Sequence, residues 1–144
     1  MTLQTAAGAR AAFLAMVNKI GAFEGILEDD LDPTDLPEGS AFATLQEGGD
    51  FLLDTIVGGQ TPQYEVYSVV NFDVLTRHKD KAEEAARRAT IVAAIESDPY
   101  LDGAVDDIRI VRADNQTEPE EGAHKARASS ITIELHYLSA SPVG

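Results

Sequence analysis

Three histidines, His78, His124 and His136, are the natural candidates for a general base in this chain. A nucleophilic triad would join one of them to a Ser or Cys and to an orienting carboxylate. The chain has no Cys, and the G-x-S-x-G pattern that marks many Ser nucleophiles does not occur. The sequence therefore predicts no catalytic residues, and we expect a protein that is not an enzyme.

The acidic run EDDLDPTDLPEG, residues 28–39, has the carboxylate density of a calcium-binding loop. An EF-hand needs Gly at its sixth position and Glu at its twelfth. Counted from Asp30, the sixth position is Asp35, and Pro33 stiffens the middle of the run. Zinc is disfavoured because there is no Cys and no His-x-x-x-His pair. We expect a solvated loop and no metal, with weak calcium binding as the alternative.

Phosphate-binding and acid–base patterns are also missing. The segment Gly58-Gly59-Gln60-Thr61 lacks the Lys with which a P-loop reaches a phosphate. The pairs Asp106-Asp107 and Glu120-Glu121 are adjacent in sequence, so their side chains point apart on an extended backbone. We expect no cofactor.

The charge balance excludes two classes of partner. The formal net charge is −14, and only Arg10 and Lys19 supply positive charge before residue 77. Nucleic acids and anionic membranes are bound mainly through Lys and Arg, so we expect neither as a direct partner. No window approaches the roughly 18 apolar residues of a membrane helix, and the N-terminus lacks signal-peptide features, which predicts a cytoplasmic location.

Apolar periodicity predicts two helices. The first runs from about Thr5 to Ile20, with Thr5 as its N-cap and Gly21 at its end. The second is Ala-rich, covers about residues 79–98, and is stopped by Asp98-Pro99.

Alternating apolar residues predict the strands. Segments 41–47 and 51–57 read as two strands separated by Gly48-Gly49, while 63–76 reads as one long strand. Further strands are expected at 104–113 and at about 130–139. On these strands Phe72, Ile133 and Tyr137 occupy the apolar side, so we expect them in the core.

These elements predict the α+β class: a mostly antiparallel sheet of about four to five strands, with the N-terminal helix and the long Ala-rich helix packed on one face. The length of 144 residues fits a single domain, 1–144. Two acidic loops are expected, at about 24–39 and 114–126.

The second half of the chain resembles the tail terminator and tail completion proteins of long-tailed bacteriophages. The resemblance rests on a long strand YEVYSVVNFDVLT, a helix ending ATIVAAIESDPYLDGAVDDIRIV, and a closing strand SSITIELHYLSA. It covers about residues 63–140, and the N-terminal helix and acidic loop more loosely.

The resemblance implies a structural subunit that forms a ring, typically of six copies, on the end of a tail tube. There it would stop tube polymerisation and present a surface for head attachment. Its expected partners are further copies of itself, the tail tube protein, and a head–tail connector or neck protein. Its expected locations are the host cytoplasm during assembly and the neck end of the virion tail. Alternatives are another neck or head–tail joining component, or a small acidic metal-binding module or enzyme.

The two acidic loops are the expected partner or subunit contacts, since long loops offer surfaces for binding. The candidate contact residues are Asp29, Asp30, Asp32, Asp35, Glu118, Glu120, Glu121 and His124.

Overall fold

The computed structural model describes residues 3–21, 25–27, 41–57, 61–77, 81–119 and 125–142. It confirms the α+β class, the antiparallel sheet and the N-terminal helix. The elements, in chain order, are α1 (Ala6–Ile20), β1 (Gly25–Leu27), β2 (Ala41–Ile56), β3 (Gln63–Arg77), α2 (Lys81–Ser97), β4 (Asp107–Pro119) and β5 (Lys125–Ser139).

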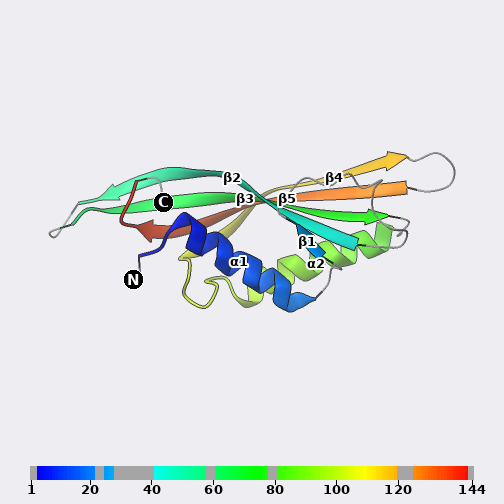
Figure 1. Cartoon of the computed structure of the whole chain (residues 1–144), viewed down its shortest axis with the longest axis horizontal. Helices are drawn as coiled ribbons and strands as arrows, with labels where there is room; N and C mark the ends of the chain where they lie inside the picture. Colours follow the sequence, from blue (N-terminus) through cyan, green and yellow to red (C-terminus); the bar gives the residue numbers. More distant parts are fainter. Residues whose placement is uncertain are drawn as a thin grey trace.

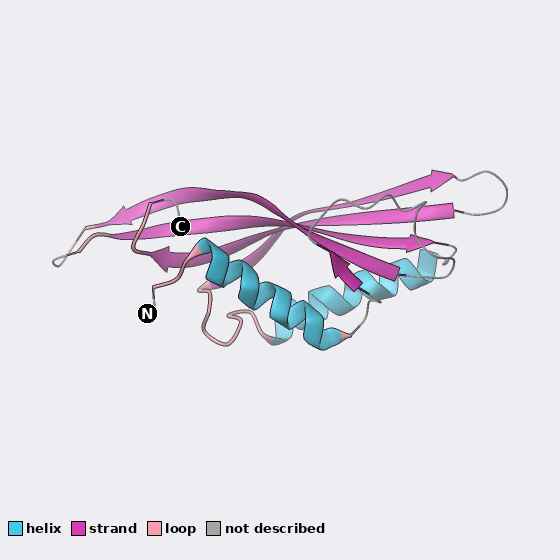
Figure 2. Ribbon diagram, in the orientation of Figure 1, coloured by secondary structure: helices cyan, strands magenta, loops and turns pink. Residues whose placement is uncertain are grey.

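The sheet has the strand order β1-β2-β3-β5-β4. Its four long strands pair antiparallel, and the short β1 adds in parallel to β2 through Phe42–Thr44. Figure 1 shows a strongly twisted sheet with long hairpins projecting at its two ends. Both helices lie on the same side of this sheet (Figure 2), so one face is covered and the other is not covered by any described element.

Helix α1 begins and ends where its capping residues predict. The Thr5 side chain accepts a hydrogen bond from the Gly8 amide at 3.0 Å, which satisfies a donor in the first turn. Gly21 follows the last turn at φ 65°, a left-handed conformation that favours glycine. The predicted caps are confirmed.

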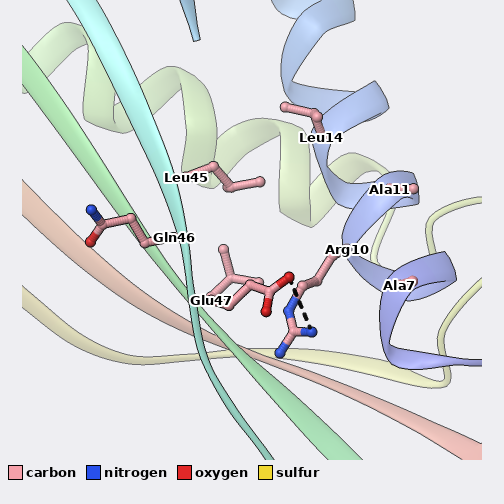
Figure 3. Close-up of a pocket in the computed structure, with 8 residues that line it drawn as sticks. Ala7, Arg10, Ala11, Leu14, Leu45, Gln46 and Glu47 are labelled. Carbon is pink, nitrogen blue, oxygen red and sulfur yellow. Dashed lines mark ion pairs between the residues drawn. The ribbon is translucent and has the colours of Figure 1, made fainter. Parts of the chain in front are cut away.

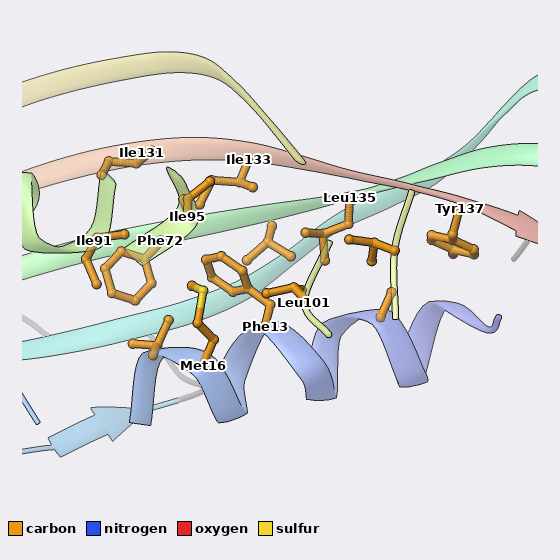
Figure 4. Packing of buried hydrophobic residues seen from close by; sticks show 14 of the residues in the cluster. Phe13, Met16, Phe72, Ile91, Ile95, Leu101, Ile131, Ile133, Leu135 and Tyr137 are labelled. Atoms are coloured by element: carbon orange, nitrogen blue, oxygen red, sulfur yellow. The ribbon is translucent and has the colours of Figure 1, made fainter. Parts of the chain in front are cut away.

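The core lies between the helices and the covered face of the sheet (Figure 4). Phe13 of α1 meets Phe72 of β3 edge to face, with ring centroids 6.3 Å apart. Phe72, Ile133 and Tyr137 are all buried, as their alternation in the sequence predicted. Ile91 of α2 is also fully buried in this cluster.

The prediction of two separate strands over 41–57 is wrong, because β2 is one continuous strand. Its pairing with β3 shifts by one residue between Glu47 and Gly49, which leaves Gly48 as the extra residue of a bulge. A Cβ at Gly48 would lie only 2.5 Å from Val69 Cγ1. Gly48 therefore permits a close approach of β2 to β3 rather than a turn.

The predicted loop at 114–126 is also wrong over most of its length. β4 continues to Pro119 and β5 begins at Lys125, with pairs such as Asn115↔Ser129 between them. The polar segment is extended because the adjacent strand offers its backbone groups a hydrogen-bonding partner, which outweighs its weak strand propensity. Within the predicted loop 24–39, Gly25–Leu27 forms β1, and the rest lies outside the described residues.

Candidate interaction surface

The predicted contact residues fall almost entirely outside the part of the chain that the structure describes. Among them, only Glu118 belongs to a described element, at the end of β4, and its side chain is not described. The others, outside the described residues, are Asp29, Asp30, Asp32, Asp35, Glu120, Glu121 and His124. Their role in binding stays a prediction.

His136 is the one histidine in the described part of the chain, and its contacts are with side chains of the sheet. It is buried on the uncovered face of the sheet, with Nε2 2.8 Å from Glu134 Oε1. Its ring stacks on Tyr67, which in turn stacks on Phe51, with centroids 5.1 Å apart in both pairs. The three rings form a ladder across β2, β3 and β5, which ties these strands together. Over the described ranges, no three His, Asp or Glu side chains gather as a metal site.

A second polar cluster links α1 to the covered face of the sheet. Arg10 Nη2 donates to Asp50 Oδ1 at 2.6 Å, and Ser68 Oγ lies 2.6 Å from both that carboxylate oxygen and the Tyr137 hydroxyl. Burial raises the pKa of Tyr137 above its ordinary value of 10.0, against the opposing effect of the hydrogen bond with Ser68. Tyr137 is therefore a neutral phenol at physiological pH, and the cluster holds strands and helix together.

A groove of about 430 Å³ lies between α1 and β2 (Figure 3). Its lining is mostly apolar, with Leu14 and Leu45 on opposite walls and Arg10 at one end. The Arg10 guanidinium already faces two carboxylates, Asp50 at 2.6 Å and Glu47 at 3.7 Å. Because its charge is neutralised from within the chain, this groove is not a ready anion site.

On the uncovered face of the sheet, several polar side chains form hydrogen bonds with one another. The Asp73 carboxylate accepts hydrogen bonds from the Thr44 and Ser130 hydroxyls, and Thr132 donates to the Asn71 side chain. These cross-strand pairs give the face a polar, internally bonded surface.

The far half of β2 has the opposite character, since it exposes a run of large apolar side chains. We call residues 51–57, the end of β2 together with Val57 that follows it, the β2 edge. Exposed fractions there reach 55% at Leu53 and 88% at Val57, and the exposed apolar residues are Phe51, Leu52, Leu53, Ile56 and Val57. β1 pairs with β2 only at Phe42–Thr44, so no described strand covers the β2 edge. An unpaired edge with contiguous apolar side chains is a template for pairing with another strand.

On the opposite side of the sheet, β4 forms a second edge with which no described strand pairs. We call residues 107–113 the β4 edge. Ile110 and Val111 are 40% and 51% exposed, and the Arg109 guanidinium donates to Asp107 Oδ2 at 2.9 Å. This hydrogen bond raises the pKa of Arg109, so the side chain is cationic at any physiological pH. The pairing of β4 with β5 shifts at Val111, which makes that residue a bulge.

The interpretation of the sequence missed the β2 edge as a surface. The segment FLLDTIV was correctly read as extended, but consecutive apolar residues on both faces of a strand are typical of a buried strand. The available signal was the run itself, between two Gly pairs and with a single charged residue.

Within the described ranges, no helix combines the length and apolar character needed to cross a bilayer. No protein-family profile matches the chain, and no curated protein matches it. Among solved structures, it is similar to the type 4 fimbrial biogenesis protein PilO from Pseudomonas aeruginosa, with a TM-score of 0.35 and 13% sequence identity. That alignment covers 91% of this chain and 68% of the PilO chain.

These findings contradict the expected family. No profile of phage tail terminators or of any other family matches, and the structural similarity described above is to a pilus biogenesis protein. The predicted ring on a tail tube, with arrest of tube polymerisation and head attachment, is therefore wrong. The resemblance rested on element order and one turn, and unrelated chains share such features because few arrangements of helices on a sheet are stable.

Proposed function

We propose that this protein is a non-enzymatic structural protein that self-associates through the β2 edge. The observation that carries the proposal is the row of exposed apolar side chains from Phe51 to Val57 on a strand edge that no described strand covers. Burial of apolar surface is the dominant favourable term in association, at about 25 cal/mol per Å².

The strand edge adds hydrogen-bonding groups to this apolar row. Alternate backbone N–H and C=O groups of an unpaired strand point away from the sheet, where a second strand can bind them. Association of two edges would pair these groups and bury the apolar side chains beside them in one step. Both gains favour an extended strand as the occupant over a small molecule.

The architecture supports this route. We also propose the detailed arrangement expected from the sequence: a sheet of four to five strands, with the Ala-rich helix α2 beside α1 on one face. Among the described residues, one face of the sheet is covered by helices and the other carries cross-strand hydrogen bonds, while the two strand edges expose both backbone groups and apolar side chains.

The polar clusters support a structural role over catalysis. The charge of Arg10 is met by Asp50 and Glu47, and Tyr137 stays protonated at neutral pH. Each group is engaged with its neighbours in the fold, so neither is positioned to act on a substrate.

The net charge predicts how self-association depends on salt. At −14 per chain, copies repel one another at low ionic strength. Exposed charges more than about 8 Å apart are screened at physiological salt. Self-association should therefore strengthen as salt rises from very low values.

Sedimentation velocity over a range of protein concentrations and salt tests the proposal. The wild type should associate, and Leu53→Asp should weaken association by placing a charge in the apolar row. Tyr100→Asp is the matched control, because Tyr100 is 57% exposed but lies in the turn after α2. A wild-type protein that stays monomeric at every concentration and salt would overturn the proposal, as would equal weakening by both substitutions.

A further inference from the structure

We infer that the β2 edge of one copy binds the β4 edge of the next copy, head to tail and antiparallel, so that the sheet continues from subunit to subunit. This inference rests on the proposed self-association and names the surface that receives the β2 edge. Four observations carry it: strand direction, matched bulges, the placement of apolar residues, and charge.

Strand direction fits the pairing. In the order β2-β3-β5-β4, each neighbouring pair is antiparallel, so β2 and β4 run in opposite directions at the two sides of one sheet. A second copy placed beside the first in the same orientation would therefore bring its β2 antiparallel to β4. The new pair would have the same polarity as the existing pairs in the sheet.

The bulges of the two edges match. β2 has an extra residue between Leu52 and Asp54, and β4 has one between Ile110 and Arg112. A bulged edge pairs poorly with a regular strand, which guards against unspecific association. Two bulges set opposite each other cancel, because each strand then contributes the same number of residues across the irregular step.

One register between the β2 edge and the β4 edge gives side chains on both sides of the paired bulges a suitable partner. Cross-strand pairs put Asp54 on the same face of the sheet as Glu65, and Arg109 on the same face as Glu134, which is the uncovered face in both cases. If Asp54 of one copy lies opposite Arg109 of the next, the numbering places Phe51 opposite Arg112. Both pairs then lie on the uncovered face.

Apolar residues fill the space between these two pairs. In the same register, Leu52 and Leu53 of one copy meet Ile110 and Val111 of the next. All four are at least 40% exposed in the single chain, so the contact buries surface that the fold leaves open. An Arg beside an aromatic ring at Phe51 adds a favourable cation–π geometry.

Charge distinguishes this pairing from the symmetric one. Asp54 is the one charged residue of the β2 edge, since Glu47 and Asp50 precede this edge and face Arg10. The β4 edge carries Arg109 and Arg112 together with one acid, Asp107. Two copies of the β2 edge would join two segments whose one charged residue is the acid Asp54, so neither copy would supply a basic partner. The β4 edge instead has two basic side chains and one acidic side chain, so it faces Asp54 with a net positive charge, which favours the head-to-tail arrangement.

Such a contact is heterologous, since each copy uses a different edge on each side. Heterologous contacts produce a closed ring if the rotation between copies closes, and an open filament if it does not. The inference therefore predicts assemblies larger than a dimer.

Cysteine cross-linking provides the test, because the natural chain has no Cys. Full-length Leu53→Cys and Ile110→Cys chains, which the register places opposite each other, are mixed in equal amounts under mild oxidation and analysed on a non-reducing gel. The expected result is a disulfide-linked dimer in the mixture and little dimer with either chain alone. A mixture of Tyr100→Cys and Ile110→Cys is the control for random collisions.

Charge exchange gives a second readout. Asp54→Arg alone should weaken self-association about fivefold, the upper range for an exposed ion pair. Combining Asp54→Arg with Arg109→Asp in one chain should restore most of the loss, because the two charges are exchanged across the same contact. Circular dichroism of each variant checks that the fold is kept.

The outcomes separate the inference from the proposed function. Efficient cross-linking of Leu53→Cys alone would overturn the head-to-tail contact and leave self-association through the β2 edge intact. Association in the ultracentrifuge that Leu53→Asp leaves unchanged, without any cross-link, would overturn both. A monomer under all conditions would do the same.

Discussion

The contrast between two phenylalanines gives the sharpest test of the fold and the surface together. Phe72 is fully buried and packs edge to face with Phe13, whereas Phe51 is 45% exposed on the β2 edge. Truncation of a buried Phe costs about 3–5 kcal/mol through lost transfer free energy and the cavity left behind. We therefore expect Phe72→Ala to lower the free energy of unfolding by about 4 kcal/mol.

Phe51→Ala should behave differently. The substitution removes the stacking of the Phe51 ring on Tyr67, whose ring centroids are 5.1 Å apart. Such aromatic pairs contribute about 0.5–1.5 kcal/mol to stability. The stability of the monomer should therefore fall by roughly 1 kcal/mol, while self-association weakens clearly.

Urea denaturation followed by circular dichroism, at a protein concentration low enough to keep chains apart, measures both free energies. An unchanged m-value would show that the surface exposed on unfolding is the same in each variant. At about 3 °C per kcal/mol for a chain of this size, Phe72→Ala should also melt roughly 12 °C lower. Equal losses for both variants would refute the assignment of Phe72 to the core and Phe51 to the surface.

Three further predictions follow from particular contacts. The raised pKa of Tyr137 means that the folded state holds the phenolic proton more tightly than the unfolded chain, so stability is full below about pH 10 and is lost as the pH rises toward the folded-state value. Tyr137→Phe should flatten this alkaline loss in thermal melts recorded between pH 8 and pH 12, and an unchanged slope would show that another group titrates. Gly48→Ala should destabilise by about 1–3 kcal/mol, because the new Cβ meets the side chain of Val69; a neutral effect in urea denaturation would mean that the bulge relaxes freely. DNA should not bind measurably in a mobility-shift assay at about 50 mM salt, where phosphate contacts are strongest, and a clear shift there would show that the net charge of −14 is a poor guide to partners.

The core was predictable from the sequence because its signal is local. Phe72, Ile133 and Tyr137 each alternate with polar neighbours, and only one face of such a strand can be buried. Thr5 and Gly21 were predictable for a similar reason, since a helix cap is decided by a few adjacent residues.

The errors came from features that depend on distant partners. Gly48 looks like a turn residue in the sequence and becomes a bulge only because β3 continues alongside it. The strand character of residues 114–119 comes from pairing with β5 rather than from their own polar composition. The exposure of the β2 edge was invisible for the same reason, since an apolar run does not reveal whether a strand covers it.

Hydrogen–deuterium exchange of the β2 edge at two protein concentrations tests the central claim most directly. Self-association through this edge predicts that backbone amides of residues 51–56 exchange more slowly at high concentration than at low concentration. Amides of α2, which lie on the covered face, should exchange at the same rate in both samples. A β2 edge whose exchange is independent of concentration, in a sample that sedimentation shows to be associated, would contradict the account.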